Sequence, residues 1–198
     1  MKNIFKTLLI AFILIGFQSC SDSELAIDKL YDQVDTSGAV IRLLEPPNGI
    51  VNLESDTPFP NFIAYNMEIQ EGDGSFDPTF TEVRVFVTAF SDNDLSIPIT
   101  DAEGNDIPEL SVETVNVSQF DVISDVNGLP SHSISNPTQD FYDMYPEGSL
   151  PNNTYLLLRW ELEMSDGRIF SAENAGGSLG ADFFAAPFAY KIKFRTNN

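Results

Sequence analysis

The sequence YLLLRWELEMSDGRIF, residues 155–170, decides the fold class of this chain. Every second side chain from position 156 to position 164 is large and apolar, which is typical of a β-strand that buries one face. The apolar row consists of Leu156, Leu158, Trp160, Leu162 and Met164. Asp166-Gly167 then predicts a tight two-residue hairpin turn with positive φ angles, after which residues 168–170 return as a second strand.

Similar short runs fill most of the chain from Gly38 onward, and Pro, Gly, Asn and Asp separate them. The further predicted strands are residues 39–44, 63–69, 83–89, 110–117 and 188–194. A change of parity between Val112 and Val115 predicts a β-bulge, and residues 101–106 predict a hairpin tip. Seven or so strands joined by turns predict an all-β fold, an antiparallel, immunoglobulin-like β-sandwich.

One segment departs from this pattern and predicts a short helix. Asn136 is a candidate N-cap, Pro137 suits the first helical position, and Gln139 follows the cap by three residues. An apolar stripe at helical spacing follows, formed by Phe141, Met144 and Tyr145. Pro146 is expected to end the helix.

The N-terminus predicts a secretory signal rather than a folded element. Two lysines precede the apolar run 8–17, which is shorter than the roughly 20 residues that span a bilayer. Ser19-Cys20 follows and resembles a bacterial lipobox, although Phe17-Gln18 stand where leucine and a small residue are commoner. We expect Cys20, the only cysteine, to be lipidated. The alternative is a soluble exported protein that is cleaved nearby and keeps a free thiol.

The chain is therefore predicted to have three parts: a signal peptide (1–19), the lipidated cysteine with an acidic tether (20–37), and a β-sandwich domain (38–198). Cleavage before Cys20 removes two lysines and lowers the formal net charge from −20 to −22.

The acids of residues 21–24 resemble the signal that sends Bacteroidota lipoproteins to the cell surface. We thus expect a lipid-anchored protein of the outer membrane that faces the cell exterior. The alternative is a solvated linker in the periplasm.

The composition excludes several classes of function. Thirty acidic against ten basic residues disfavour nucleic acid and other anionic partners. One cysteine excludes an intrachain disulfide framework and a thiolate zinc cluster. The single histidine, His132, is expected in a loop after residues 128–130 and excludes a two-histidine metal site. Carboxylate-lined turns at Asp73, Asp92 and Asp101 leave calcium open, but none completes an EF-hand. We expect no cofactor.

Catalytic patterns are incomplete. The G-x-S-x-G match at 176–180 lacks a following helix and a later histidine, so it does not predict a nucleophile elbow. Glu161 and Glu163 share one strand face with Arg159, and Arg168 lies across the turn. That arrangement favours solvated ion pairs over a glycosidase pair. The sequence therefore predicts that the chain is not an enzyme.

Residues 136–145 are the candidate ligand site, because they combine aromatic rings with amide and carboxylate groups. Tyr142 lies off the apolar stripe and, with Asp143, is the first candidate for contact with a neutral glycan or a peptide. Phe141 and Tyr145 are further candidates, although their helical spacing is more typical of core residues. The alternative is that the helix only caps an open end of the sandwich.

Four segments occur in an order that resembles a group of uncharacterised flavobacterial surface lipoproteins. They are residues 38–42 (GAVIR), 128–130 (GLP), 165–170 (SDGRIF) and 183–190 (FFAAPFAY). Those proteins tend to be encoded beside SusC/SusD-type uptake systems, each a TonB-dependent transporter with a SusD-like lipoprotein. The resemblance implies a β-sandwich accessory binding protein without catalytic residues. The alternative is a structural or adhesive envelope protein without a small ligand.

Overall fold

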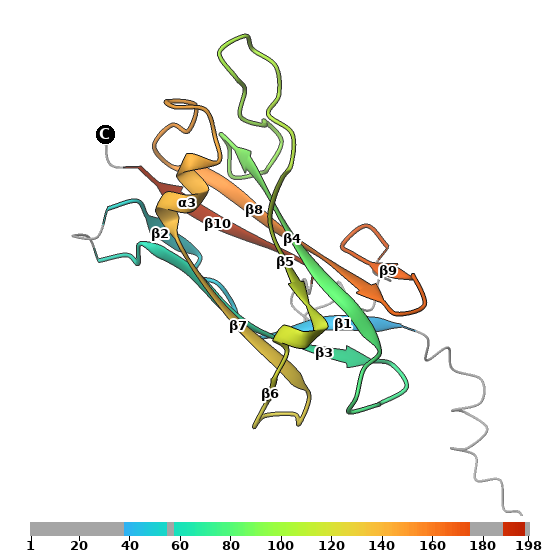
Figure 1. Cartoon of the computed structure of the whole chain (residues 1–198). Helices are drawn as coiled ribbons and strands as arrows, with labels where there is room; N and C mark the ends of the chain where they lie inside the picture. Colours follow the sequence, from blue (N-terminus) through green and yellow to red (C-terminus); the bar gives the residue numbers. More distant parts are fainter. Residues whose placement is uncertain (1–37, 55–57, 175–187, 197–198) are drawn as a thin grey trace, which may run out of the picture. The chain divides into compact units, whose positions relative to one another are not determined.

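The alternating segments of the sequence become the strands of two packed sheets (Figure 1). The computed structural model describes residues 38–54, 58–174 and 188–196. The predicted signal peptide, Cys20, the tether, the G-x-S-x-G segment and most of residues 183–190 lie outside the described residues. In the part of the chain that is described, no helix is long and apolar enough to cross a bilayer.

Two sheets and one short helix make up the fold of the described residues. The first sheet has the order β1 (Ala39–Glu45), β3 (Phe62–Glu71), β7 (Pro130–Pro137) and β6 (Val122–Ile123). The second has the order β2 (Ile50–Asn52), β10 (Ala189–Arg195), β8 (Thr154–Met164), β4 (Phe80–Phe90) and β5 (Leu110–Asn116), with β9 (Ile169–Phe170) also paired to β8. A 3-10 turn, η1 (Val117–Gln119), follows β5, and helix α3 (Thr138–Asp143) follows β7. The predicted all-β sandwich with one short helix is confirmed, and its strands pair antiparallel except β10 with β2.

The core lies between the sheets, where the apolar rows of the strands meet. The five apolar side chains of β8 are all at most 1% exposed, and those of β4 from Val83 to Ala89 are buried in the same way. Tyr65 of the first sheet stacks edge-on against Trp160 of the second, with ring centroids 5.4 Å apart. Aromatic pairs of this geometry stabilise a core beyond the area that they bury. The period-two pattern therefore predicts the buried faces of β3, β4 and β8 correctly.

The predicted bulge in β5 is also confirmed. Val85 of β4 pairs with Glu113, and the next residue, Phe86, pairs with Ser111, so Val112 is the extra residue. The bulge restores the inward parity for the C-terminal half of β5. As a consequence Glu113 points to the same side as buried Val115.

Three predicted local details are wrong. Of the two predicted turn residues, only Gly167 has a positive φ, of 86°. Met164 N–H donates to the Arg168 carbonyl, so residues 165–167 form a three-residue loop instead of a two-residue one. Asn136 does not cap the helix. It belongs to β7, and the N-cap is Pro137, without a side-chain hydrogen bond. His132 lies in β7 and not in a loop, and its Nδ1 contacts the Gln119 carbonyl at 2.8 Å.

The outer face of β3 contains a buried charge that alternation alone does not predict. Glu68 is 0% exposed, although its neighbours Met67 and Ile69 face the core. Arg42 Nε lies 3.2 Å from Glu68 Oε1, and the side-chain amide of Asn127 donates to the same oxygen. The turn that contains Asn127 is thereby held against the sheet.

The strand directions divide the sandwich into two ends, which we name by residues. The Gly38 end consists of Gly38 with the connections 72–79, 117–129 and 165–168. The α3 end consists of α3 with the connections 91–109 and 144–153. The 11-residue strands β4 and β8 separate the two ends by about 33 Å.

Candidate functional site

Helix α3 is fixed to the end of the sandwich by one buried threonine. The Thr138 hydroxyl shares its single proton between the carbonyls of Asn52 (2.8 Å) and Asn61 (2.9 Å), and Thr138 N–H donates to the Asn61 carbonyl. Phe141 is 2% exposed and Tyr145 is 5% exposed, so both rings belong to the core. The apolar stripe predicted from the sequence thus closes this end of the sandwich.

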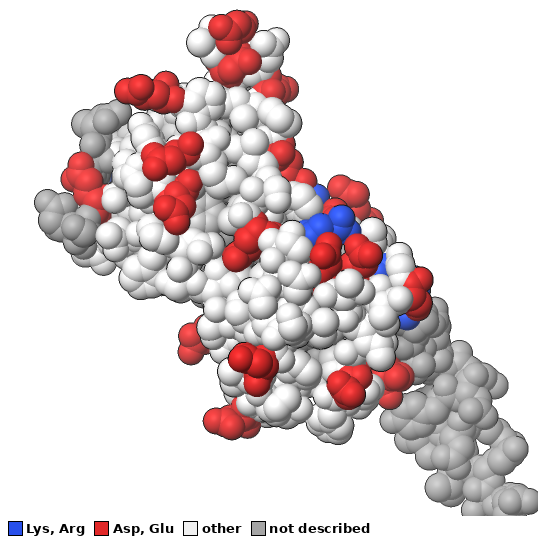
Figure 2. All heavy atoms as spheres, viewed as in Figure 1, with Lys and Arg blue, Asp and Glu red and all other residues white. Residues whose placement is uncertain are grey.

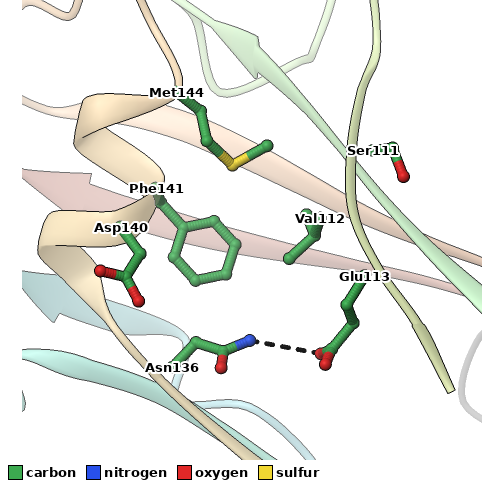
Figure 3. A pocket seen from close by; sticks show the side chains of 7 residues that line it. All are labelled: Ser111, Val112, Glu113, Asn136, Asp140, Phe141 and Met144. Carbon is green, nitrogen blue, oxygen red and sulfur yellow. Dashed lines mark hydrogen bonds between the residues drawn. The ribbon is translucent and has the colours of Figure 1, made fainter.

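A groove runs between α3 and the edge strand β5 (Figure 3). Its volume is about 300 Å³, and it is lined by Ser111, Val112, Glu113, Asn136, Asp140, Phe141 and Met144. Phe141 and Met144 point from the helix side toward Val112 of β5, so the middle of the groove is apolar. At one end Asn136 Nδ2 donates to Glu113 Oε1 at 3.2 Å, which joins the edges of the two sheets.

Glu113 is a partly buried carboxylate in the wall of this groove. Partial burial raises the pKa of its carboxyl group, while the hydrogen bond from Asn136 and the charge of His132 oppose the rise. The Tyr65 hydroxyl contacts Glu113 Oε1 at 3.5 Å, and burial together with the Glu113 charge raises the pKa of Tyr65. Glu113 is therefore held in place as a hydrogen-bond acceptor at the groove wall.

A second hollow, of about 450 Å³, lies beside the same helix and is lined by Tyr142, Asp143, Tyr145 and Glu147. Gln139 Nε2 donates to Asp143 Oδ1 at 2.7 Å, which orients the exposed carboxylate. The Tyr145 hydroxyl is buried without a hydrogen-bond partner, and burial and the charge of Glu109 raise its pKa. The hollow therefore presents two carboxylates next to a partly buried tyrosine ring, Tyr142.

The structure brings the predicted site residues together around α3 but divides their roles. Tyr142 is partly buried and Asp143 is exposed, so both remain available for contact with a ligand. Phe141 and Tyr145 are core residues that present only one edge to the groove or the hollow. The sequence analysis does not predict Glu113 as a site residue. Val115, two residues later on the same strand, is a core residue, and its spacing from Glu113 places both side chains on the same face.

In two of the candidate calcium loops, the Asp92 and Asp101 carboxylates accept hydrogen bonds from groups of their own turns. Asp101 accepts hydrogen bonds from Asn105 N–H at 2.8 Å and from Glu103 N–H at 3.0 Å, and these bonds lower its pKa. Asp92 is slightly desolvated, yet bonds from Ser96 and Ile97 lower its pKa overall. Within the described ranges, no three acidic, histidine or cysteine side chains are placed to hold a metal ion.

The outer face of β4 and β8 contains the ion pairs expected for Glu161 and Glu163. Arg84 Nη2 lies 3.1 Å from Glu163 and 3.5 Å from Glu161, and Arg159 Nη1 lies 2.8 Å from Glu161. Arg168 bonds to Asp166 of its own turn. Figure 2 shows acidic side chains spread over the visible surface, whereas the few visible basic ones lie along one side of it. The two glutamates therefore serve as partners of arginines.

The similarities found for this chain are to solved structures. No family model matches the chain, and no match is found among curated proteins. A similar solved structure is the crystal structure of a candidate carbohydrate binding protein from Bacteroides uniformis, with 15% identity and a TM-score of 0.31. The match covers 78% of this chain and 57% of that protein, so the chain spans less than two thirds of its length. This likeness does not bear on what the present chain binds.

Proposed function

We propose that this chain is a non-enzymatic binding protein that holds a neutral, hydroxyl-rich ligand, a glycan, at the α3 end of its sandwich. The observation that carries the proposal is the pair of hollows beside one helix, where apolar or aromatic side chains adjoin oxygen acceptors. The acceptors are the side-chain oxygens of Glu113, Asn136, Asp140, Asp143 and Glu147. Carboxylates at neutral pH only accept hydrogen bonds, so a matching ligand is rich in O–H or N–H donors. An anionic ligand would be repelled.

We further propose that the domain is tethered to the outer membrane through lipidated Cys20 and faces the cell exterior. Support comes from the position of the only cysteine directly after the apolar N-terminal run. The resemblance to flavobacterial surface lipoproteins supports a place beside a SusC/SusD-type uptake system, as an accessory that binds the nutrient. A peptide is the second ligand class that the same acceptors fit.

The competing function, a structural or adhesive envelope protein, also has a specific observation in its favour. Phe141 and Tyr145 are buried, which is what a helix that only caps the sandwich requires. The two functions differ in the role of Tyr142. If helix α3 only caps the sandwich, Tyr142 contributes only packing. If the chain is a binding protein, the Tyr142 ring lies against the ligand.

The test uses the full chain, purified in detergent, with a panel of neutral oligosaccharides and acidic ones as negative probes. Tyr142→Ala is expected to weaken binding of the best neutral probe by about tenfold. The same change should cost less than about 1 kcal/mol of unfolding free energy, because Tyr142 is only partly buried and lies at the margin of the core. Tyr155→Ala, on the outer face of β8, is the matched control and should leave affinity unchanged.

A large loss of stability with intact affinity would make α3 a cap. Failure of every neutral glycan and peptide to bind would favour the structural function.

A further inference from the structure

Exposed apolar side chains gather at the end of the sandwich opposite to α3. Of the nine large apolar residues that are exposed among the described positions, five lie in the connections of the Gly38 end, and a sixth, Ile169, directly follows connection 165–168. They are Phe76, Val117, Val122, Ile123, Val126 and Ile169. Four of them, Phe76 (70% exposed), Val122 (60%), Ile123 (59%) and Val126 (73%), form what we call the apolar tip. Clusters of this kind mark surfaces that bind another apolar surface.

The apolar tip is an ordered structure and not a frayed loop. The Phe76 ring reaches to within 3.6 Å of the position that a Cβ on Gly128 would occupy, so connection 72–79 lies against the turn 124–129. That turn is closed by Gly128 N–H to the Ser124 carbonyl (2.8 Å) and by Ser124 N–H to the Leu129 carbonyl (2.9 Å). The bond from Asn127 to buried Glu68 fastens the turn to the sheet. Phe76 therefore lies beside the turn that contains Val126, and β6, with Val122 and Ile123, leads directly into that turn.

The chain enters the sandwich at this same end. Gly72 N–H donates to the Gly38 carbonyl at 2.8 Å, and Ala39 pairs with Glu71, so β1 begins beside connection 72–79. Residues 21–37 separate Gly38 from Cys20. The Gly38 end is therefore the end of the sandwich that lies nearest to Cys20 along the chain.

The charges around the apolar tip restrict its partner. Asp73, Asp77, Asp121 and Asp125 flank the four apolar residues, and neither 72–79 nor 117–129 contains a lysine or arginine. A surface that attracts anionic headgroups would need basic residues. The tip instead suits a zwitterionic lipid surface, into which apolar side chains insert without a charge attraction.

We propose that the apolar tip inserts into the surface of the bilayer that holds the Cys20 lipid, so that the α3 end points away from the membrane. The proposal rests on the lipid anchor of the proposed function. A lipid chain and an apolar tip together give two points of attachment. Because two points define an orientation, the candidate ligand site would be held about one strand length from the membrane.

The experiment places an environment-sensitive fluorophore on Val126→Cys in the lipidated full chain, reconstituted into phosphatidylcholine vesicles. The lipid occupies the Cys20 sulfur, so the label attaches to the introduced thiol. Asn105→Cys, in the hairpin at the α3 end, is the matched control. Nitroxide-bearing lipids should quench the label at 126 at least about twice as strongly as the label at 105. Phe76→Asp, at a 70% exposed site, should remove that difference while the protein stays on the vesicles.

Two results would overturn the proposal, and they differ in what else they affect. Equal quenching at 126 and 105 on vesicle-bound protein would leave the anchor intact and assign the tip to a protein partner or to none. Release of the protein from the vesicles would remove the anchor and the inference together. Added phosphatidylglycerol should lower the quenching at 126, because four aspartates flank the tip. A rise would show that an electrostatic contact, and not apolar insertion, holds this end.

Discussion

Trp160 is a completely buried side chain at the centre of the sandwich, where it meets Tyr65 of the opposite sheet. Trp160→Ala should cost about 3–5 kcal/mol of unfolding free energy, because it leaves a cavity between the sheets. Leu157→Ala, on the outer face of the same strand, should cost about 1 kcal/mol. Urea unfolding of both variants checks the assignment of the two faces. An equal or larger loss at Leu157 would reverse it.

Glu113 provides a prediction about pH. Burial raises its pKa, so the folded chain keeps a proton at pH values where the unfolded chain has released it. The associated stability is complete below the unfolded pKa and is lost as the pH rises through the raised value. Glu113→Gln should therefore flatten the pH dependence of stability above about pH 4.5 and raise stability at pH 7 by at most about 1 kcal/mol.

The measurement for Glu113 is a series of urea unfolding curves between pH 4 and 8. The same substitution at Glu147, an exposed carboxylate in the neighbouring hollow, is the control. A Glu113→Gln variant that is strongly destabilised at neutral pH would mean that the charged form is needed to hold Asn136 and Tyr65. The raised pKa would then not describe the role of this side chain.

At the scale of elements, the β8–β9 hairpin depends on one glycine. Gly167 has a φ of 86°, a conformation that a side chain with a Cβ adopts at a cost of about 1–2 kcal/mol. Gly167→Val should destabilise by that amount or more. Gly49→Val is a suitable control, because Gly49 has no positive φ and no atom within 4 Å of its would-be Cβ. Equal unfolding free energies of the two variants would contradict the strained turn.

The same hairpin shows how far an element can be predicted from its residues. Asp166-Gly167 marked the turn correctly, but the loop has three residues because Met164 N–H pairs with the Arg168 carbonyl. The Asn136-Pro137 pair was assigned to the helix, yet β7 continues through both residues. Asn136 reaches Glu113 across the gap between the sheets, and that long-range bond outweighs a local cap. Local sequence patterns therefore predict where an element lies better than they predict the residues at which it begins and ends.

At the scale of the whole molecule, the anchor gives the last prediction. Cys20→Ala in the full chain should release the protein from native membranes, because the only cysteine is the only residue that can take the lipid. Fractionation with a carbonate wash measures this, with Ser19→Ala as a neighbouring control. A variant that remains with the membranes would show that another attachment dominates.

The two ends of the molecule differ in a way that no single segment reveals. The α3 end contains both hollows, and the Gly38 end contains the apolar tip and the point where the chain enters. The residues of the tip come from connections that are about 45 positions apart in the sequence, such as Phe76 and Val122. Strand directions bring them together, so their exposure and proximity needed the folded chain.

The sequence predicts the β class, the inward rows of β3, β4 and β8, a bulge between Val112 and Val115, and the stripe of α3. Each of these depends on the spacing of apolar side chains along one segment, because a strand or helix sorts its own side chains by a fixed period. That spacing does not predict the burial of Glu68, the contacts of Glu113 with Asn136 and Tyr65, or the parallel pairing of β10 with β2. Those facts depend on which strand edges and turns pack together, and this is set by contacts between residues far apart in the chain.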